Sequence, residues 1–236
     1  MLEALRLLYL AISSKEPLNF KVRFLDADEN LAIVSDLHLF RTKSPGLLGS
    51  FLRSSGIRKL VVAGDMFDDL EGAMGPEELR PYLRAALRYL RIPDGTEIHY
   101  IVSRHSHDPT PFPGTQSHSL GNALVKVYSG PLVIRGHGLR IFCTHGDEFV
   151  KKGYAAYAIN MLARSMGHGL LVERLSRERV LKGWDEWFVM GHTHFPGMDP
   201  ENKLANAGAW ASPLRKATNS ALTVTDRGVR LFYLGR

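Results

Sequence analysis

Short apolar runs, each closed by turn-forming residues, recur along the chain and predict an α/β protein. Leu31–Ser35 and Leu60–Ala63 are continuously apolar, which is typical of strands buried on both faces. Between them, Leu47–Ser55 fits a helix that stops at Gly56. The further strands expected are Phe20–Leu25, Glu97–Val102, Ala123–Tyr128, Leu132–Arg135, Leu139–Cys143, Asp185–Met190, Leu204–Asn206, Ala221–Thr225 and Val229–Leu234.

Three segments carry the helical spacing of apolar residues instead. In Leu79–Arg91 the leucines share one stripe and the arginines lie opposite, as on a solvated helix face. Met1–Ser14 reads as an amphipathic helix packed on the domain, since it lacks the basic start and the cleavage site of a signal peptide. Its expected stripe consists of Leu2, Leu5, Leu8 and Ile12. Residues 150–183 are expected to form a helical insertion or lid.

The order of these elements predicts the architecture. Early strands alternate with helices, as in βαβ units, whereas the later strands follow one another closely. We therefore expect a single α/β domain over residues 1–236, a four-layer αββα sandwich of two mixed sheets flanked by helices. The stretch after Val102 through Ser119 is expected to be a long loop, and the three strands between Ala123 and Cys143 a meander.

Composition excludes several classes of protein. The 236 residues are 44% hydrophobic and 23% charged, which is ordinary for a globular domain and rules out a disordered or fibrous chain. No apolar run reaches about 18 residues, so no membrane span and a cytoplasmic location are expected. Cys143 is the one cysteine, which excludes a disulfide framework and a cysteine zinc cluster. The formal charge of +6 favours anionic partners without choosing among them.

Four of the expected strands end in aspartate or histidine, and this is where chemistry is indicated. Open α/β sheets bind ligands at the carboxyl ends of their strands, so we expect these side chains on one rim. Side chains that lie two residues apart on an extended segment point to the same side, so both members of such a pair would face one point. Mixed carboxylate and imidazole donors suit manganese, iron or zinc. Ordinary polar strand ends would explain one such case but not four. The residues are Asp36, His38, Asp65, His145, His192 and His194.

This ordered set resembles the calcineurin-like metallophosphoesterase superfamily. The stretches that carry the resemblance are Ser35–Leu39 (SDLHL), Gly64–Asp68 (GDMFD), Cys143–Asp147 (CTHGD) and Gly191–Pro196 (GHTHFP). The resemblance implies a binuclear phosphoesterase in which a metal-bridging hydroxide attacks a phosphodiester or pyrophosphate bond. Two divalent ions would be the cofactors, with manganese expected and iron, zinc, nickel or cobalt as alternatives.

Matching residue by residue implies a ligand set for each ion. Asp36, His38 and His194 would hold one metal, His145 and His192 the other, and Asp65 would bridge them. Two ions about 3.5–4 Å apart can activate water and stabilise both the attacking and the leaving oxygen.

One block departs from the family's G-N-H-D pattern, because this chain reads Val102-Ser-Arg-His-Ser-His-Asp108. In one register Arg104 replaces the asparagine and His105 is catalytic, but a guanidinium cannot bind a cation. The preferred register is Ser106-His107-Asp108. There His107 would protonate the leaving group or bind phosphate, Asp108 would orient it, and Ser106 or His105 would complete the second metal site. A loop histidine pair without a ligand role is the alternative.

Finer motifs resemble the UDP-2,3-diacylglucosamine hydrolase branch of the superfamily. These are His145–Asp147 (HGD), Gly191–Pro196 and Asn206–Trp210 (NAGAW), with a helical insertion between the first two. The resemblance implies a phosphorylated small-molecule or lipid-linked substrate, with peripheral membrane contact open. The apolar insertion could cover such a substrate or simply pack against the domain. The oligomeric state is not predicted.

Two other functions remain open. Repair nucleases share these motifs and the chain is basic, so a DNA-end nuclease is one alternative, although no basic groove interleaved with aromatic residues is visible. A non-catalytic scaffold that kept the fold is the other. The altered asparagine block favours the scaffold, and the intact set of six candidate ligands argues against it.

Overall fold

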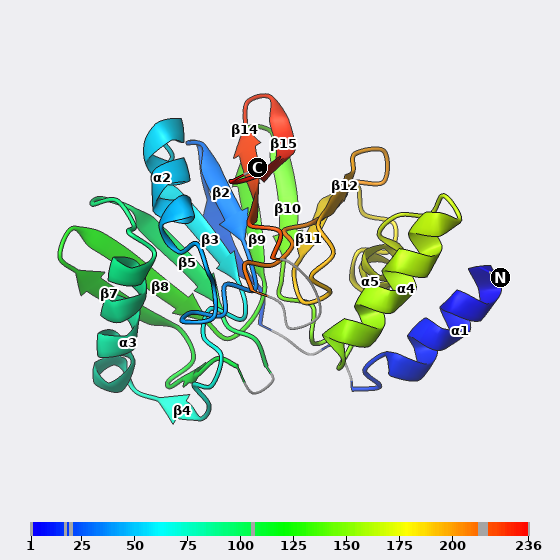
Figure 1. Ribbon diagram of the computed structural model, residues 1–236, viewed down its shortest axis with the longest axis horizontal. Coiled ribbons are helices and arrows are strands. Elements are labelled where there is room, and N and C mark those ends of the chain that lie inside the picture. Colours follow the sequence, from blue (N-terminus) through cyan, green and yellow to red (C-terminus); the bar gives the residue numbers. More distant parts are fainter. Residues whose placement is uncertain (1, 17, 19–20, 105–106, 212–216, 236) are drawn as a thin grey trace.

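A computed structural model describes residues 2–16, 18, 21–104, 107–211 and 217–235. Within this part of the chain, two large mixed sheets lie face to face and five helices cover their outer faces (Figure 1). The prediction of a mixed α/β protein with two packed sheets is confirmed. None of the described helices is both long and apolar enough to cross a bilayer.

The larger sheet contains seven strands in the order β15-β14-β2-β3-β5-β8-β7. Its four central strands, β2, β3, β5 and β8, run parallel, and antiparallel strands close both edges. The bounds are β2 (Leu31–Val34), β3 (Lys59–Ala63), β5 (Glu97–Ile101), β7 (Gln116–Leu120), β8 (Ala123–Tyr128), β14 (Ser220–Thr225) and β15 (Gly228–Tyr233).

The smaller sheet contains six strands in the order β1-β9-β10-β11-β13-β12. Strands β10, β11 and β13 run parallel, while β9 pairs antiparallel with β10. Its strands are β1 (Arg23–Asp26), β9 (Leu132–Gly136), β10 (Leu139–Cys143), β11 (Trp187–Met190), β12 (Gly197–Asp199) and β13 (Leu204–Asn206). A separate two-stranded ladder joins β4 (Ala73–Met74) and β6 (Thr110–Pro111).

The helices form the two outer layers (Figure 1). Helices α2 (Gly46–Ser55) and α3 (Pro76–Tyr89) cover the larger sheet. Helices α1 (Leu2–Ile12), α4 (Gly153–Ser165) and α5 (Leu171–Val180) cover the smaller one. The last two account for the expected helical insertion.

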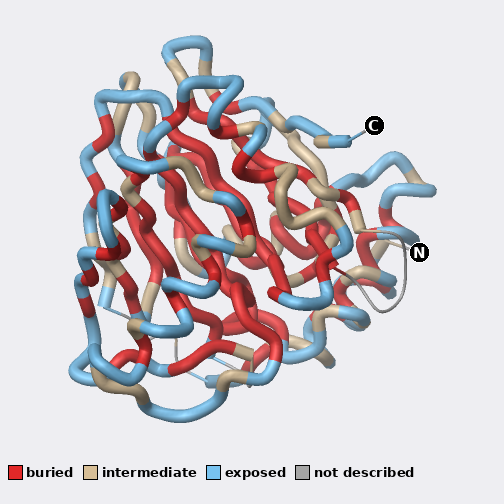
Figure 2. Tube along the Cα trace, turned by 60° about the vertical axis from the view of Figure 1, so that its left-hand side comes forward, coloured by how far each residue is buried: buried red, intermediate tan, exposed pale blue. Residues whose placement is uncertain are grey.

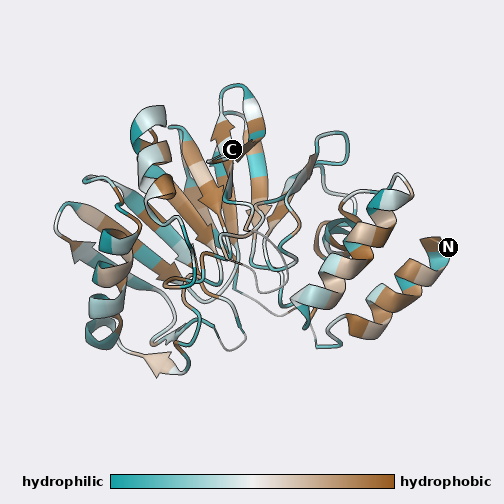
Figure 3. Cartoon of the chain, in the orientation of Figure 1, coloured by the Kyte–Doolittle hydropathy of each residue, from teal (hydrophilic) through white to brown (hydrophobic). Residues whose placement is uncertain are grey.

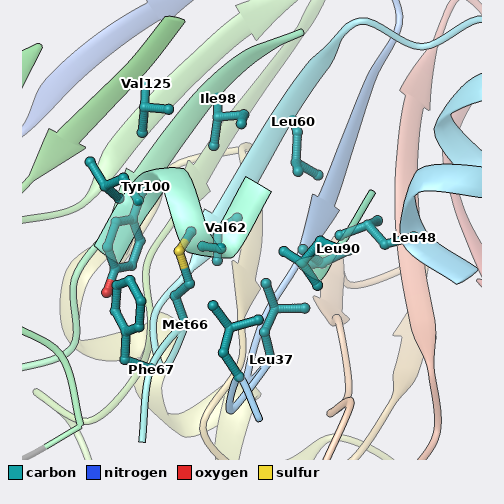
Figure 4. Close-up of a cluster of buried hydrophobic side chains, with 14 of the residues drawn as sticks. Leu37, Leu48, Leu60, Val62, Met66, Phe67, Leu90, Ile98, Tyr100 and Val125 are labelled. Atoms are coloured by element: carbon teal, nitrogen blue, oxygen red, sulfur yellow. The ribbon is translucent and has the colours of Figure 1, made fainter. Parts of the chain in front are cut away.

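Three buried apolar layers hold the sandwich together, and the sheet strands are its most buried part (Figure 2). Side chains alternate along a strand, so β2 sends Ala32 and Val34 toward the helices and Leu31 and Ile33 toward the second sheet. The continuously apolar run of β2 is thus explained by burial on both faces. Figure 4 shows the layer under α2 and α3, including Leu48 and Val62.

Two expectations about the middle of the chain are wrong. The stretch expected to be a loop through Ser119 contains β6 and β7. The strands between Ala123 and Cys143 do not form a meander, because β8 pairs with β7 in one sheet while β9 and β10 form a hairpin in the other. Strand β7 alternates buried and exposed residues, and its Gln-Ser-His-Ser-Leu sequence lacks the apolar run of the central strands.

Helix α1 exists as expected, but its packed face differs. Leu5 and Tyr9 are buried, whereas Leu8 of the expected stripe is 50% exposed. Leu7 and Leu10 are also exposed, so the helix is apolar on nearly all sides (Figure 3). With apolar residues all round, the sequence pattern alone cannot choose the packed face.

Candidate metal centre

The strand ends that carry the candidate ligands meet where the two sheets face each other. In the larger sheet, parallel β2 and β3 lead to Asp36 and Asp65, and the Asp36 amide donates to the Gly64 carbonyl at 3.1 Å. In the smaller sheet, parallel β10 and β11 lead to His145 and to the loop of residues 191–194. His145 Nδ1 donates across the sheets to the Ala63 carbonyl at 2.9 Å. The expected common rim therefore exists.

The ligand residues reach this rim through backbone conformations that the sequence did not predict. An extended segment was expected to point paired side chains the same way, and that explanation is wrong. The φ angles are 51° at Asp36, 42° at His38, 48° at Asp65, 61° at His192 and 54° at His194. Left-handed non-glycine residues are strained and cluster at functional sites.

One group of donors consists of Asp36, His38 and His194. Their ligand atoms all lie within 4.8 Å of one another. Asp36 Oδ1 is 2.9 Å from His194 Nε2, and the rings of His38 and His194 are 5.5 Å apart. This is the trio that the family resemblance assigns to one metal.

Asp65 lies between this group and a second one. Its Oδ2 is 3.8 Å from His38 Nε2, and its Oδ1 is 3.4 Å from His145 Nε2. The ligand atoms of Asp36, Asp65 and His145 also lie within 4.8 Å of one another. One oxygen of Asp65 thus faces each group, which is the arrangement a bridging carboxylate needs.

His192 lies beside the second group, although among the described residues its ligand atoms are not counted with those that lie within 4.8 Å of one another. Its Nε2 donates to the Val150 carbonyl at 2.6 Å, which leaves Nδ1 as the atom that can bind a cation. The ring lies 5.0 Å from that of His145, and the His192 amide donates to Asp36 Oδ2 at 3.0 Å.

Hydrogen bonding in the cluster is incomplete in the way a cation site requires. Asp36 Oδ1, His38 Nε2 and Asp65 Oδ1 are shielded from solvent and accept or donate no well-aligned hydrogen bond within the described residues. Buried polar atoms left in this state cost free energy, and a bound cation removes that cost. The donor set therefore fits a pair of divalent ions.

The charges in the cluster perturb one another strongly. Burial raises the pKa of Asp65, whereas His194 holds the pKa of Asp36 below its usual range despite burial. Asp65 raises the pKa of His145 to about 10, against the effect of burial. Burial and the neighbouring His145 lower the pKa of His192 to about 4. Perturbations of this kind are characteristic of functional sites.

Two glycines make the close approach possible. A Cβ on Gly64, whose φ is +80°, would lie 2.3 Å from the ring of His145. A Cβ on Gly191 would lie 2.1 Å from Ser35 Oγ and 2.5 Å from Asp36 Oδ2. Any larger residue would push a candidate ligand out of place.

The divergent block places His107 at the centre. Its Nδ1 donates to the Asp68 carbonyl at 2.7 Å, and its ring is 5.3 Å from that of His38. His105 and Ser106, proposed as a catalytic residue and a metal ligand, lie outside the described residues. Arg104 is exposed, and its amide donates to Asp147 Oδ2 at 2.6 Å.

The expected role of Asp108 needs correction. His107 is oriented by the hydrogen bond that its Nδ1 donates to the Asp68 carbonyl, whereas the Asp108 carboxylate accepts backbone amides. Its Oδ2 accepts Asp65 N at 2.7 Å and Ser103 N at 2.9 Å, and its Oδ1 accepts Phe67 N at 3.1 Å. Asp108 therefore fixes the backbone that carries Asp65.

Further residues support the candidate ligands from outside the cluster. Asp68 Oδ1 lies 3.2 Å from His38 Nδ1, where it can orient the His38 ring. Arg41, which forms an ion pair with Asp68, had no sequence signal. Neither had Glu148, which accepts the Gly146 amide at 3.0 Å, nor the buried Glu173 of α5.

Comparison with known proteins adds no family assignment. No protein-family model matches the chain, and no curated protein matches it. The motifs and the geometry of the cluster are therefore the whole basis for a functional proposal.

Proposed function

We propose that this protein is a binuclear metal-dependent phosphoesterase of the calcineurin-like kind, acting on a phosphodiester or pyrophosphate bond. The observation that supports the proposal most is the position of Asp65, which turns one carboxylate oxygen toward His38 and the other toward His145. Its Oδ1 and the neighbouring Asp36 Oδ1 and His38 Nε2 are buried without a well-aligned hydrogen bond in the described part of the chain.

In this proposal Asp36, His38 and His194 would hold one ion, His145 and His192 would hold the other, and Asp65 would contribute to both. When bound, such ions supply the charge that activates water and stabilises a phosphoryl transition state. Manganese is the proposed metal, on the chemistry of the donors.

His107 is proposed to serve the leaving group. Because Nδ1 donates to the Asp68 carbonyl, Nε2 is the ring atom that can transfer a proton. The ring is only partly buried, so a substrate can reach it. Arg41, 61% exposed beside Asp68, adds positive charge at the rim, which suits a phosphorylated substrate.

The test is to load the purified protein with Mn²⁺ and to follow hydrolysis of bis(p-nitrophenyl) phosphate. We expect turnover in the wild type and a loss of about a thousandfold or more in Asp65→Ala, since metal stabilisation is worth several kcal/mol. Asp185→Asn, which changes an 89% exposed carboxylate, is the matched control and should keep full activity.

The alternatives give different results in the same series. A DNA-end nuclease would degrade duplex ends and show a steep salt dependence. A scaffold would show no turnover with any divalent metal, and that result would overturn the proposal.

A further inference from the structure

A fully buried polar cluster joins the helical insertion to the loop that carries His192 and His194. At its centre is Glu173 of α5, which has no exposed surface. Its Oε1 accepts the Thr193 hydroxyl at 2.8 Å and Asn206 Nδ2 at 2.9 Å, and its Oε2 accepts Asn160 Nδ2 at 2.8 Å. Thr193, Asn160 and Asn206 are themselves fully buried.

The direction of these hydrogen bonds is fixed by the backbone. Asn160 Oδ1 accepts the Val172 amide at 2.9 Å, and Asn206 Oδ1 accepts the Gly208 amide at 2.9 Å. The amide nitrogens of both asparagines must therefore donate, and they face Glu173. Both side-chain oxygens of Glu173 therefore accept hydrogen bonds, which a carboxylate can do and a side-chain amide cannot.

The cluster closes around a strained turn. The Thr193 amide donates to the Gly191 carbonyl at 2.6 Å, which makes a three-residue turn centred on His192 with its φ of 61°. Turns of this kind with a positive central φ are rare and strained. Asn206 Nδ2 also donates to the Gly191 carbonyl at 2.9 Å, so both ends of the turn are held by groups that Glu173 binds.

We infer that Glu173 is a positioning residue that holds the strained turn and thereby aims His192 and His194 at the metal pair. This inference rests on the proposed function. Strained backbone persists only where the surroundings over-determine it, and here the surroundings are α5, Asn206 and, through Asn160, α4. The insertion is then a structural support of the metal centre, whatever substrate it covers.

Titration of the metal-free protein with Mn²⁺ by calorimetry at 25 °C tests the inference without using activity. We compare wild type, Glu173→Gln and Glu186→Gln. The last is the matched control, because Glu186 is a buried carboxylate paired with Arg140 at 2.9 Å and has no hydrogen bond to the turn in the described structure.

Glu173→Gln should weaken binding of at least one Mn²⁺ by about 10- to 100-fold. The reason is that the NH₂ group of the glutamine would face side chains that also donate hydrogen bonds. Glu186→Gln should bind as wild type does. Wild-type affinity in a folded Glu173→Gln protein would overturn the inference.

A second variant keeps the test decisive if Glu173→Gln does not fold. Thr193→Val keeps the shape of the side chain and removes the hydroxyl that donates to Glu173, so we expect Mn²⁺ binding about tenfold weaker. Unchanged affinity there also overturns the inference. If the wild type binds no Mn²⁺, the inference and the proposed function both fail; if it binds Mn²⁺ but hydrolyses no phosphoester, only the proposed function fails.

Discussion

Replacement of Asp108 by asparagine separates two roles that the divergent block could serve. The buried carboxylate accepts three backbone amides, from Asp65, Phe67 and Ser103. Asparagine has the same shape but one acceptor oxygen. If that oxygen keeps the two bonds made by Oδ2, the side-chain NH₂ group must face the Phe67 amide, donor against donor.

The expected cost follows from those contacts. A hydrogen bond to a charged group contributes about 1.5–3 kcal/mol, and a buried donor left without a partner costs about 1–3 kcal/mol. We expect Asp108→Asn to lower the free energy of unfolding by about 3 kcal/mol. In a chain of this length that corresponds to a fall in Tm of about 6–12 °C.

Thermal unfolding of the metal-free protein, followed by circular dichroism, measures this change, and His107→Gln is the matched control. His107 is partly exposed, and the side-chain hydrogen bond that it makes within the described residues goes to a backbone carbonyl, so its loss should leave Tm within about 2 °C while reducing phosphoester hydrolysis. If Asp108→Asn kept the wild-type Tm and lost only activity, Asp108 would act on His107, and its role in fixing the backbone of Asp65 would be refuted.

Two further predictions concern stability and the close approach at Gly64. His99 is buried, and burial lowers its pKa to about 4, below the ordinary 6.5, so the unfolded chain takes up a proton that the folded protein refuses. Because of this group, the free energy of unfolding should fall by about 2 kcal/mol from pH 7 to pH 5. Urea unfolding of His99→Gln at the two pH values should show a correspondingly smaller fall. A fall equal to that of the wild type would contradict the role given to His99. Gly64→Ala would place a Cβ 2.3 Å from the His145 ring at a φ of +80°, so we expect the free energy of unfolding to fall by about 2–4 kcal/mol and one Mn²⁺ to bind more weakly. If the Gly64→Ala protein bound Mn²⁺ as the wild type does in calorimetric titration, the steric argument would be wrong.

The strands most accurately predicted from the sequence are those buried on both faces or bounded by clear turns. Ala123–Tyr128, Leu139–Cys143 and Leu204–Asn206 have the predicted bounds. Strand β7 was not predicted, because its sequence is polar and it lies at a sheet edge, where only every second side chain is buried. The packed face of α1 was predicted wrongly, because apolar residues surround the helix.

Within the site, the sequence indicated the candidate donors through their position after strands. Asp36, Asp65 and His145 lie within ligand distance of one another, as their common rim predicted. The sequence could not assign the role of Asp108. A carboxylate next to a histidine gives the same sequence pattern whether it contacts the histidine ring or the backbone of residues far away in the chain. Glu173 had no signal, since one glutamate on an amphipathic helix resembles any other until its neighbours are known.

The sequence by itself determined the local chemistry: which segments form strands, which donor types follow them, and that glycines flank three of those ends. Strand periodicity and turn residues act over a few positions, so one sequence displays them. Only the tertiary structure decided how the two sheets divide the strands, which backbone torsions turn the donors toward one point, and which buried groups hold them there. These depend on contacts between residues far apart in the chain, such as Asp65 with Asp108 and Thr193 with Glu173, and no local pattern encodes them.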